Sequence, residues 1–397
     1  MINRSQEMIL NKVKKKVVFL TGTRADFGKV KSLISVIQSD SKFIVDIFVT
    51  GMHLQKQYGF TANEIIEAGF KNIFKFKNFT NDPSMEVILA NTIIGFSKYI
   101  KKNKPDLIVI HGDRVEALAG AITGAINNVL VSHIEGGEVS GTIDESIRHA
   151  VSKFSHIHFA TDMASKKRLI QLGEKSSNIF ILGSPNFDLM KPSKMIPLSI
   201  AKDYYDINFI DYGILLFHPV TTELHQLKKD TKALIAAVKK SKKNFIVIYP
   251  NNDSGSQFII EEYLKNLDSE KFKLFPSLRF EYFLSLLKAS KLLIGNSSCG
   301  LREAPFFGVP TINIGTRQNR RSSLKSIINI PPIQGKILHA INATFNSGKI
   351  HPKPSLNYNL ESDKKFYRIL VGNKIWNIHN QKNFNDISSI IYNKYFK

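Results

Sequence analysis

Hydrophobic positions along the chain follow two alternating patterns. Short runs rich in β-branched residues, typical of buried strands, are separated by longer stretches in which apolar residues recur at helical spacing. Strands that alternate with helices form parallel βαβ units with right-handed crossovers. In the first half, the pattern predicts strands at residues 16–22, 43–51, 72–77, 106–113, 129–137, 157–161 and 179–183, and helices at about 26–38, 84–102, 114–127 and 144–154.

A second set of the same kind follows a polar stretch near residues 188–208, and no repeat recurs at a fixed period. We therefore predict an α/β fold of two doubly wound domains, with a ligand cleft where the strand ends of the two domains face each other. The predicted strands of this set are 213–218, 244–249, 271–276, 292–296 and 310–315, and the predicted helices are 223–239, 280–289, 334–345 and a terminal amphipathic helix at 387–396.

The length of 397 residues suggests two or three domains of roughly 100–200 residues each. We place the N-terminal domain at residues 1–188 and the C-terminal domain at residues 189–370. The remaining segment, about residues 371–397, is expected to pack back on the first domain as a helix.

The chain is strongly basic, with 55 Lys and Arg against 33 Asp and Glu and a net charge of +22. Such a charge suits nucleic acid, an anionic membrane face, an anionic small molecule, or lysines that merely cover solvated faces. The lysines are scattered and form no aromatic-interleaved stripe, which argues against nucleic acid. Cys299 is the sole cysteine, which excludes an intramolecular disulfide and a Cys-based zinc finger. Without a signal-peptide core or an apolar span of about 20 residues, we expect a cytoplasmic protein that does not bind membranes.

The first candidate segment, residues 21–29, joins a strand to a helix. Gly22 lets the backbone approach a ligand, and free amides at the helix start suit a phosphate. Arg24 and Lys29 add positive charge. The segment matches neither the dinucleotide-binding glycine pattern nor a Walker loop, so it does not favour NAD or ATP. An ordinary strand–turn–helix connection remains open.

Carboxylates gather just past another strand, in residues 133–149. Crowded carboxylates raise the pKa of one member, so that one acts as an acid while another acts as a base. A capped, solvated helix start is the alternative for this group. Asp113, which follows the strand at 106–110, could be a general base, a clamp for a substrate hydroxyl or the N-cap of the next helix. No metal-ligand motif is present, so no metal is expected. The candidates are Asp113, Glu135, Glu138, Asp144 and Arg148.

Polar residues follow strands of the second half in the same way. The stretch 295–305 places small residues at a helix start, which suits a diphosphate, and a glutamate that could accept hydrogen bonds from ribose hydroxyls. A plain loop with an N-cap is the alternative. Cys299 is interpreted as a small packing residue, because no Cys–His arrangement marks it as reactive. The candidates here are His218, Asn251, Arg279, Ser297, Ser298 and Glu303.

Together these segments resemble the hydrolysing UDP-N-acetylglucosamine 2-epimerases, which open bacterial sialic acid synthesis. The resemblance runs in order from about residue 16 to residue 320. The matching segments are 21–29, 49–53, 111–114, 133–149, 217–223, 249–253, 275–283, 295–305 and 315–320.

The resemblance implies two Rossmann-like domains of the glycosyltransferase-B type, with the sugar nucleotide in the cleft between a catalytic first domain and a UDP-binding second domain. It also implies a homodimer without a cofactor. By motif, the catalytic acids are Asp113, Glu135 and Asp144, with Glu138 and Arg148 as further candidates. The substrate or UDP contacts are Arg24, Lys29, His218, Asn251, Arg279, Ser297, Ser298 and Glu303.

One departure from related enzymes bears on the reaction. The non-hydrolysing epimerases carry an Arg-rich stretch after the histidine that corresponds to His218, whereas this chain has Pro219, Val220, Thr221 and Thr222, as in the hydrolysing branch. Hydrolysing 2-epimerases of a UDP-2,4-diacetamido-trideoxy sugar, used in legionaminic acid synthesis, carry very similar motifs and are the first alternative. The second is a glycosyltransferase of the same fold, which would lack the carboxylate cluster. The third is a nucleic-acid-binding module, which steep salt-dependent retention would reveal.

Overall fold

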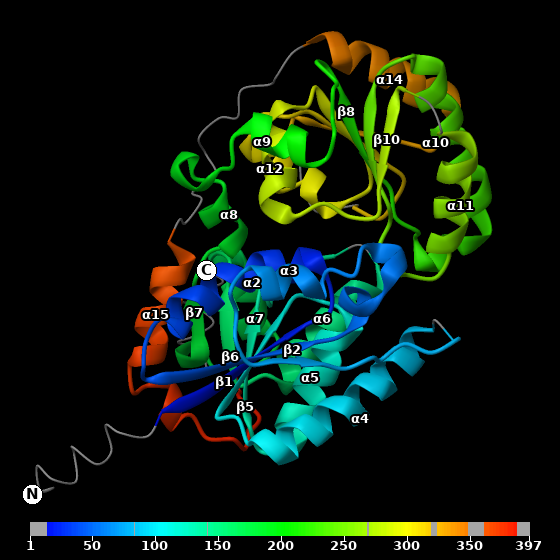
Figure 1. Cartoon of the computed structure of the whole chain (residues 1–397). Helices are drawn as coiled ribbons and strands as arrows, with labels where there is room; N and C mark the ends of the chain where they lie inside the picture. The colour runs from blue at the N-terminus through cyan, green and yellow to red at the C-terminus, as the bar shows by residue number, and fades with distance from the viewer. Residues whose placement is uncertain are drawn as a thin grey trace, which may run out of the picture.

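The structure, a computed structural model, describes residues 14–82, 84–140, 142–267, 270–318, 324–347 and 361–386. It consists of two α/β domains, one above the other in Figure 1, each with helices around a parallel sheet. This confirms the predicted fold class, and the arrangement is of the glycosyltransferase-B type.

The first domain contains a seven-stranded sheet in the order β3-β2-β1-β4-β5-β6-β7, with every pair parallel. All seven predicted strands are present. Helices cover both faces, so a central strand such as β4 is buried along its whole length. The strands are β1 (Lys15–Thr21), β2 (Phe43–Val49), β3 (Ile73–Lys75), β4 (Leu107–His111), β5 (Leu130–Ile134), β6 (Ile157–Ala160) and β7 (Ile179–Ile181). The helices are α2 (Arg24–Gln38), α3 (Ala62–Glu67), α4 (Met85–Asn103), α5 (Val115–Ile126), α6 (Ile143–Phe154), α7 (Met163–Gln171) and α8 (Pro185–Leu189).

The second domain contains a six-stranded parallel sheet in the order β10-β9-β8-β11-β12-β13. Five of its strands were predicted. The sixth, β13, was not predicted, although three of its four residues are isoleucines. The strands are β8 (Gly213–Leu216), β9 (Phe245–Ile248), β10 (Phe272–Phe275), β11 (Leu292–Gly295), β12 (Thr311–Ile314) and β13 (Ile327–Ile330). The helices are α9 (Leu198–Tyr204), α10 (Leu227–Ser241), α11 (Ser256–Asn266), α12 (Phe280–Ala289), α13 (Glu303–Phe306) and α14 (Gln334–Ser347).

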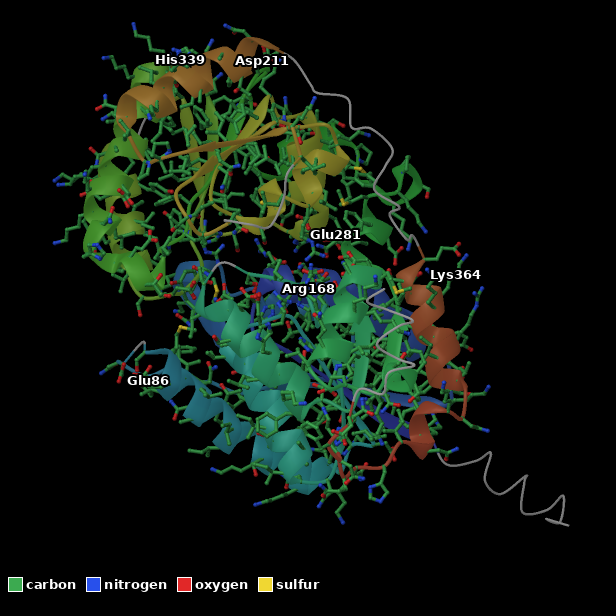
Figure 2. All side chains as sticks on the ribbon, turned by 180° about the vertical axis from the view of Figure 1, so that it is seen from behind. Glu86, Arg168, Asp211, Glu281, His339 and Lys364 are labelled. Carbon is green, nitrogen blue, oxygen red and sulfur yellow. The ribbon has the colours of Figure 1, made fainter. Side chains whose placement is uncertain are left out.

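Both sheets reverse their strand order at one point, between β1 and β4 in the first domain and between β8 and β11 in the second. Ligands of open α/β sheets bind outside the carboxyl ends of the strands at such points. The two domains meet near these ends, and the Lys31 ammonium of α2 lies 2.5 Å from the Glu281 carboxylate of α12 across the boundary. Figure 2 shows Glu281 of the second domain and Arg168 of the first domain near this boundary from behind. The fold therefore brings the two sets of candidate residues together.

The chain returns to the first domain at α15 (Ser362–Val371), which packs against α2 and α8 (Figure 1). Phe366 and Leu370 are buried in the core of the first domain, and the Asp188 carboxylate accepts the backbone N–H of Glu361 at 2.5 Å. The return thus begins before residue 371, and residues 362–370 pack with the first domain instead of the second. The helix predicted at 387–396 lies outside the described residues. Across the described part of the chain, no helix combines the length and the apolar character needed to cross a bilayer.

Candidate active site

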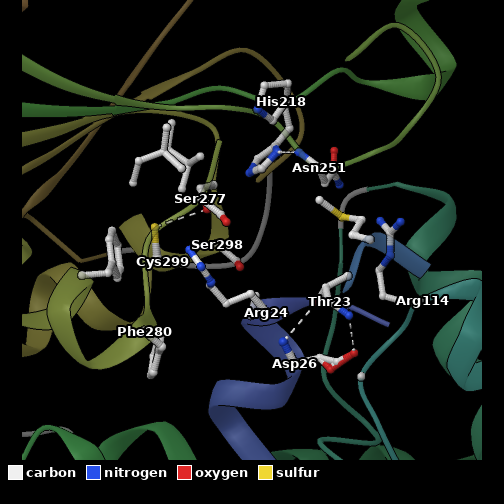
Figure 3. A pocket seen from close by; sticks show the side chains of 18 of the residues that line it. Thr23, Arg24, Asp26, Arg114, His218, Asn251, Ser277, Phe280, Ser298 and Cys299 are labelled. Carbon is white, nitrogen blue, oxygen red and sulfur yellow. Dashed lines mark hydrogen bonds between the residues drawn. The ribbon is translucent and has the colours of Figure 1, made fainter. Parts of the chain in front are cut away.

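A cavity of about 290 Å³ lies between the two domains at the carboxyl ends of their strands (Figure 3). Most of the predicted site residues line it. They are Arg24, Lys29, Asp113, Asp144, His218, Asn251, Ser297, Ser298 and Glu303. The other four, Glu135, Glu138, Arg148 and Arg279, are not among the lining residues.

The turn after β1 is organised by Asp26. Its carboxylate accepts the backbone N–H groups of Gly22 at 2.8 Å and Thr23 at 3.1 Å, and the Thr23 hydroxyl caps the start of α2. The amides of Gly22, Thr23 and Asp26 therefore already have partners within the turn, whereas the expected phosphate contact of the other amides at the helix start stays a prediction. Arg24 instead faces the cavity, and Figure 3 shows its side chain directed towards Ser298 of the second domain. Burial lowers the pKa of Arg24 to about 10, so the guanidinium remains charged at neutral pH.

Arg24 also has hydrogen-bonding capacity left for a ligand. It pairs with Glu64 of α3. Its Nε and Nη1 atoms are buried and have no hydrogen-bond partner among the described residues. Because unpaired buried donors are costly, this arrangement favours an anionic ligand at this end of the cavity.

Asp113 and Asp144 form the carboxylate pair at the cavity wall. Asp113 pairs with the Arg148 guanidinium and accepts a hydrogen bond from the Ser140 hydroxyl at 3.1 Å. Burial and the negative charge of Asp113 raise the pKa of Asp144, although Arg317 lies 3.5 Å away. Asp144 is therefore more easily protonated than an ordinary aspartate, whereas Asp113 is paired with a guanidinium. The two groups are thus suited to complementary roles as base and acid.

Glu135 lies behind the cavity wall, fully buried among cations. Its carboxylate is 3.1 Å from Lys29 Nζ and 3.1 Å from His111 Nε2, and it accepts the Ser184 hydroxyl at 2.6 Å. Arg302 of the second domain donates to both of its oxygens. The charges of Arg302, Lys29 and His111 outweigh the desolvation of the carboxylate and hold the pKa of Glu135 well below its ordinary value. The Glu135 carboxylate thus contacts two side chains that line the cavity, Lys29 and His111.

The backbone at Glu135 is itself held in an unusual conformation. Its φ of +64° lies in the left-handed region, which costs a non-glycine residue about 1–2 kcal/mol. The Arg148 guanidinium donates to the Glu135 carbonyl at 2.7 Å, and Glu138 pairs with Arg302 at 3.0 Å. Arg148 and Glu138 therefore hold this loop and its partners from outside the cavity.

His218 is fixed on the opposite wall. The Asn296 side chain accepts its backbone N–H at 2.7 Å and donates to its carbonyl at 2.9 Å. The backbone N–H of Asn251 donates to His218 Nδ1 at 3.1 Å, and burial lowers the pKa of His218 to about 3. A neutral ring whose Nδ1 accepts a hydrogen bond carries its proton on Nε2. His218 is therefore a neutral Nε2–H donor in the cavity.

The segment after β11 supplies small residues and a carboxylate. Ser297 and Ser298 line the cavity at the start of the short helix η6 (Ser298–Gly300), and the buried Glu303 accepts the Asn186 side-chain N–H at 2.5 Å. Burial raises the pKa of Cys299 to about 12, so its thiol stays protonated, which agrees with the packing role expected from the sequence. In the described part of the chain, no group of three His, Cys, Asp or Glu side chains is placed to hold a metal ion.

Sequence reasoning missed the arginines that cross between the domains. Arg114 donates to Asp253 at 2.7 Å and to Asn252 at 2.6 Å, and Arg317 and Arg302 reach the first-domain carboxylates described above. These arginines lie inside or beside the matched segments, and their position there is the signal that could have marked them.

Arg279 lies outside the cavity lining. It pairs with Glu67 of α3, and its guanidinium lies 5.0 Å from the centre of the Tyr204 ring. It thus joins the two domains at the rim of the boundary, and its predicted contact with the substrate stays a prediction.

Comparisons with known proteins give a consistent result. The family model for UDP-N-acetylglucosamine 2-epimerase matches residues 35–371. The chain is 44% identical over 376 residues to a UDP-N-acetylglucosamine 2-epimerase of Neisseria meningitidis serogroup B, covering 94% of this chain and 100% of the relative. It is 33% identical over 341 residues to the UDP-N,N'-diacetylbacillosamine 2-epimerase (hydrolyzing) of Legionella pneumophila, covering 85% and 90%. The crystal structure of the Methanocaldococcus jannaschii UDP-GlcNAc 2-epimerase in complex with UDP-GlcNAc and UDP shares the fold, with a TM-score of 0.72 at 20% identity over 90% and 99% of the two chains.

Proposed function

Since the chain belongs to the UDP-N-acetylglucosamine 2-epimerase family, we propose that it hydrolyses UDP-N-acetylglucosamine to UDP and N-acetylmannosamine, the sugar from which sialic acid is made. The observation that carries the proposal is the pair Asp113 and Asp144, which faces a cavity whose other wall presents Arg24, His218 and Ser298. This arrangement suits a sugar ring at the carboxylates and a diphosphate at the donors.

The substrate dictates an elimination. The C2 proton of an N-acetylhexosamine is poorly acidic, because C2 is not attached to a carbonyl, so direct deprotonation and reprotonation is disfavoured. Loss of UDP from C1 as a carboxylate removes the C2 proton gives UDP and 2-acetamidoglucal. Water then adds its oxygen to C1 while a proton reaches C2 from the opposite face. The sum is one water consumed, with UDP and N-acetylmannosamine released.

The surroundings of the two carboxyl groups support a different role for each in the proposed reaction. Asp113, paired with Arg148, is suited to take the C2 proton, and Asp144, whose pKa is raised, is suited to return a proton to the other face of C2. Both groups exchange with solvent between turnovers. Elimination also places negative charge on the departing diphosphate, which Arg24, the Nε2–H of His218 and Ser298 are positioned to stabilise.

Hydrolysis, as opposed to return of a UDP-sugar, is supported by the segment after His218. Residues 219–222 carry no cation, unlike the Arg-rich stretch of the non-hydrolysing enzymes. The diacetamido-trideoxy sugar nucleotide is a second candidate substrate, favoured by the 33% identity to the Legionella enzyme. The higher identity to the Neisseria enzyme supports UDP-N-acetylglucosamine as the first. A homodimer in the cytoplasm completes the proposal, on the basis of the family resemblance.

The purified protein tests the reaction directly. It is incubated with UDP-N-acetylglucosamine and, separately, with UDP-2,4-diacetamido-2,4,6-trideoxyglucose, and products are followed by NMR. We expect free N-acetylmannosamine and UDP, with a higher kcat/KM for the first substrate. Formation of UDP-N-acetylmannosamine without free sugar would exclude hydrolysis, and a higher kcat/KM for the second substrate would reassign the enzyme.

UDP affinity tests the second-domain contacts. Ser297→Ala combined with Ser298→Ala, or Glu303→Gln alone, should weaken UDP binding about ten- to hundredfold, because hydrogen bonds to charged groups contribute roughly 1.5–3 kcal/mol each. Isothermal titration calorimetry with UDP measures the effect. As a control, Ser177→Ala alters an exposed serine of the first domain and should leave the affinity unchanged. Wild-type affinity in the first two variants would remove these residues from the UDP site.

A further inference from the structure

Arg302 connects the two domains through Glu135. It lies between η6 and α13 of the second domain, and its guanidinium donates to Glu135 Oε1 at 2.7 Å and to Glu135 Oε2 at 2.9 Å. It also donates to the Ser184 hydroxyl at 2.7 Å and to Glu138 at 3.0 Å. Both members of the pair are shielded from solvent, since side-chain exposure is 16% for Arg302 and 2% for Glu135. Arg302 is not one of the residues that line the cavity.

The groups that surround Glu135 come from several elements. Lys29 of α2 and His111 of β4 face its carboxylate, and Arg148 of α6 holds its carbonyl. Glu138 is the nearby acid, and it shares Arg302 with Glu135. Lys29, His111, Arg148 and Glu138 all belong to the first domain. Among the described partners of the Glu135 carboxylate, Arg302 alone comes from the second domain, so its contact requires the two domains to be together.

The contact between Arg302 and Glu135 affects the cavity through two other side chains. Lys29 and His111 both line the cavity, and both rest on the Glu135 carboxylate from behind. A bidentate arginine–carboxylate pair fixes the orientation of the carboxylate as well as its charge. The position of Lys29 and His111 at the wall therefore depends on a contact that the second domain provides.

We propose that Arg302 is a positioning residue that links the approach of the two domains to the arrangement of the reacting site, by holding Glu135 and through it Lys29 and His111. The inference rests on the proposed hydrolysis, since its effect is read from that activity. When the domains separate, Glu135 loses its bidentate partner, and Lys29 and His111 are held less firmly. When the domains meet around a sugar nucleotide, Arg302 fixes Glu135 and thereby the positions of Lys29 and His111.

Arg302→Ala tests the inference through kcat and its pH dependence. We expect kcat to fall roughly tenfold or more, because small displacements of positioned groups have effects of this size. The acid limb of the pH–kcat profile should move upward by about one pH unit, since a buried carboxylate that loses an adjacent cation is more easily protonated. Arg302→Lys retains the charge and should keep the acid limb near its wild-type position while kcat stays reduced.

Added guanidinium ion provides a readout that general loss of structure would not give. It should restore much of the kcat of Arg302→Ala in a saturable way, and it should fail to do so when Glu135→Gln is also present. As a matched control, Arg168→Ala removes a first-domain arginine that donates to the Gly137 carbonyl in the neighbouring loop. This control should show neither the pH shift nor the rescue.

These experiments distinguish a failure of the proposed function from a failure of the proposed role of Arg302. An inactive wild-type protein would overturn the proposed function. An active wild type with an Arg302→Ala variant of unchanged kcat and pH profile would overturn the role of Arg302 alone. If Arg302→Ala fails to fold, Arg302→Lys decides, because wild-type kcat in that variant would show that the bidentate contact does not matter. Rescue by guanidinium that persists with Glu135→Gln would show that Arg302 does not act through Glu135.

Discussion

Replacing Asp113 with Asn should lower kcat for UDP-N-acetylglucosamine hydrolysis by about 10²–10⁴-fold, the usual contribution of a positioned general base. The amide keeps the shape of the side chain and its contact with the Ser140 hydroxyl, but it cannot take the C2 proton. UDP should bind nearly as well as before, because the donors proposed for the diphosphate lie elsewhere in the cavity. Steady-state kinetics and UDP calorimetry on the same preparation measure the two effects.

Asp144→Asn should reduce kcat to a similar extent for the complementary reason, since an amide does not deliver a proton to C2. In D₂O the wild-type product should carry deuterium at C2, because the returned proton comes from a group that exchanges with solvent. Glu145→Gln is the matched control: this carboxylate follows Asp144 on α6 but is 37% exposed and does not line the cavity. Product with hydrogen retained at C2, or Asp113→Asn with wild-type kcat, would contradict the mechanism.

The sequence predicted the frame of the molecule because buried parallel strands are apolar over their whole length. The run from Leu107 to His111 is buried at every position, and Gly112, Asp113 and Arg114 follow it directly, so both the strand and the place of Asp113 could be predicted. Burial does not explain why the edge strand β13 was missed, because β10, an edge strand without a buried residue, was predicted.

The candidate site was predictable as far as it depends on residues near in sequence. Asp113 and Asp144 follow different strands whose carboxyl ends lie on one edge of a sheet, and topology alone brings them to the same cavity. The use of the Gly22 and Thr23 amides by Asp26 was also within reach, because Thr23 and Asp26 have the spacing of a capping box.

The partners of Glu135 could not be predicted from the sequence. Its strongest partner, Arg302, is 167 residues away and belongs to the other domain. Whether a carboxylate meets solvent, substrate or an arginine then depends on how two domains pack, and the local pattern around residue 135 is the same in each case. The sequence therefore predicted a reacting group at Glu135 but not the ion pairs that surround it, and the catalytic role of Glu135 stays a prediction.

Two buried histidines should make the protein sensitive to acid. His53 lies between the hydroxyls of Thr21 and Thr61, and His133 lies between the Ser152 hydroxyl and the Gly112 carbonyl. Burial lowers the pKa of each to about 3. In the unfolded chain a histidine binds its proton near pH 6.5. Below that pH the unfolded state binds more protons than the folded state, so the free energy of unfolding decreases.

Between neutral pH and pH 5, each of these histidines should lower the free energy of unfolding by about 2 kcal/mol. His133→Gln isolates one of them, since this side chain does not line the cavity. The variant should be less stable than wild type at pH 7 by about 1–3 kcal/mol, because hydrogen bonds in the core are lost. Between pH 7 and pH 5, however, it should lose about 2 kcal/mol less than wild type, because the group that the unfolded state protonates is gone.

Buried carboxyl groups whose pKa is raised act in the opposite direction, and the comparison of variants removes their contribution. Burial raises the pKa of Asp26 and of Glu116, so their folded forms bind protons first and gain stability as the pH falls. Both groups are present in wild type and in His133→Gln, so the difference between the two unfolding curves reports the histidine. Urea unfolding at intervals from pH 7 to pH 5 measures it, with the exposed His225→Gln as the control that should follow wild type. Parallel curves for wild type and His133→Gln would show that His133 takes up its proton in the folded protein, against the low pKa that its burial imposes.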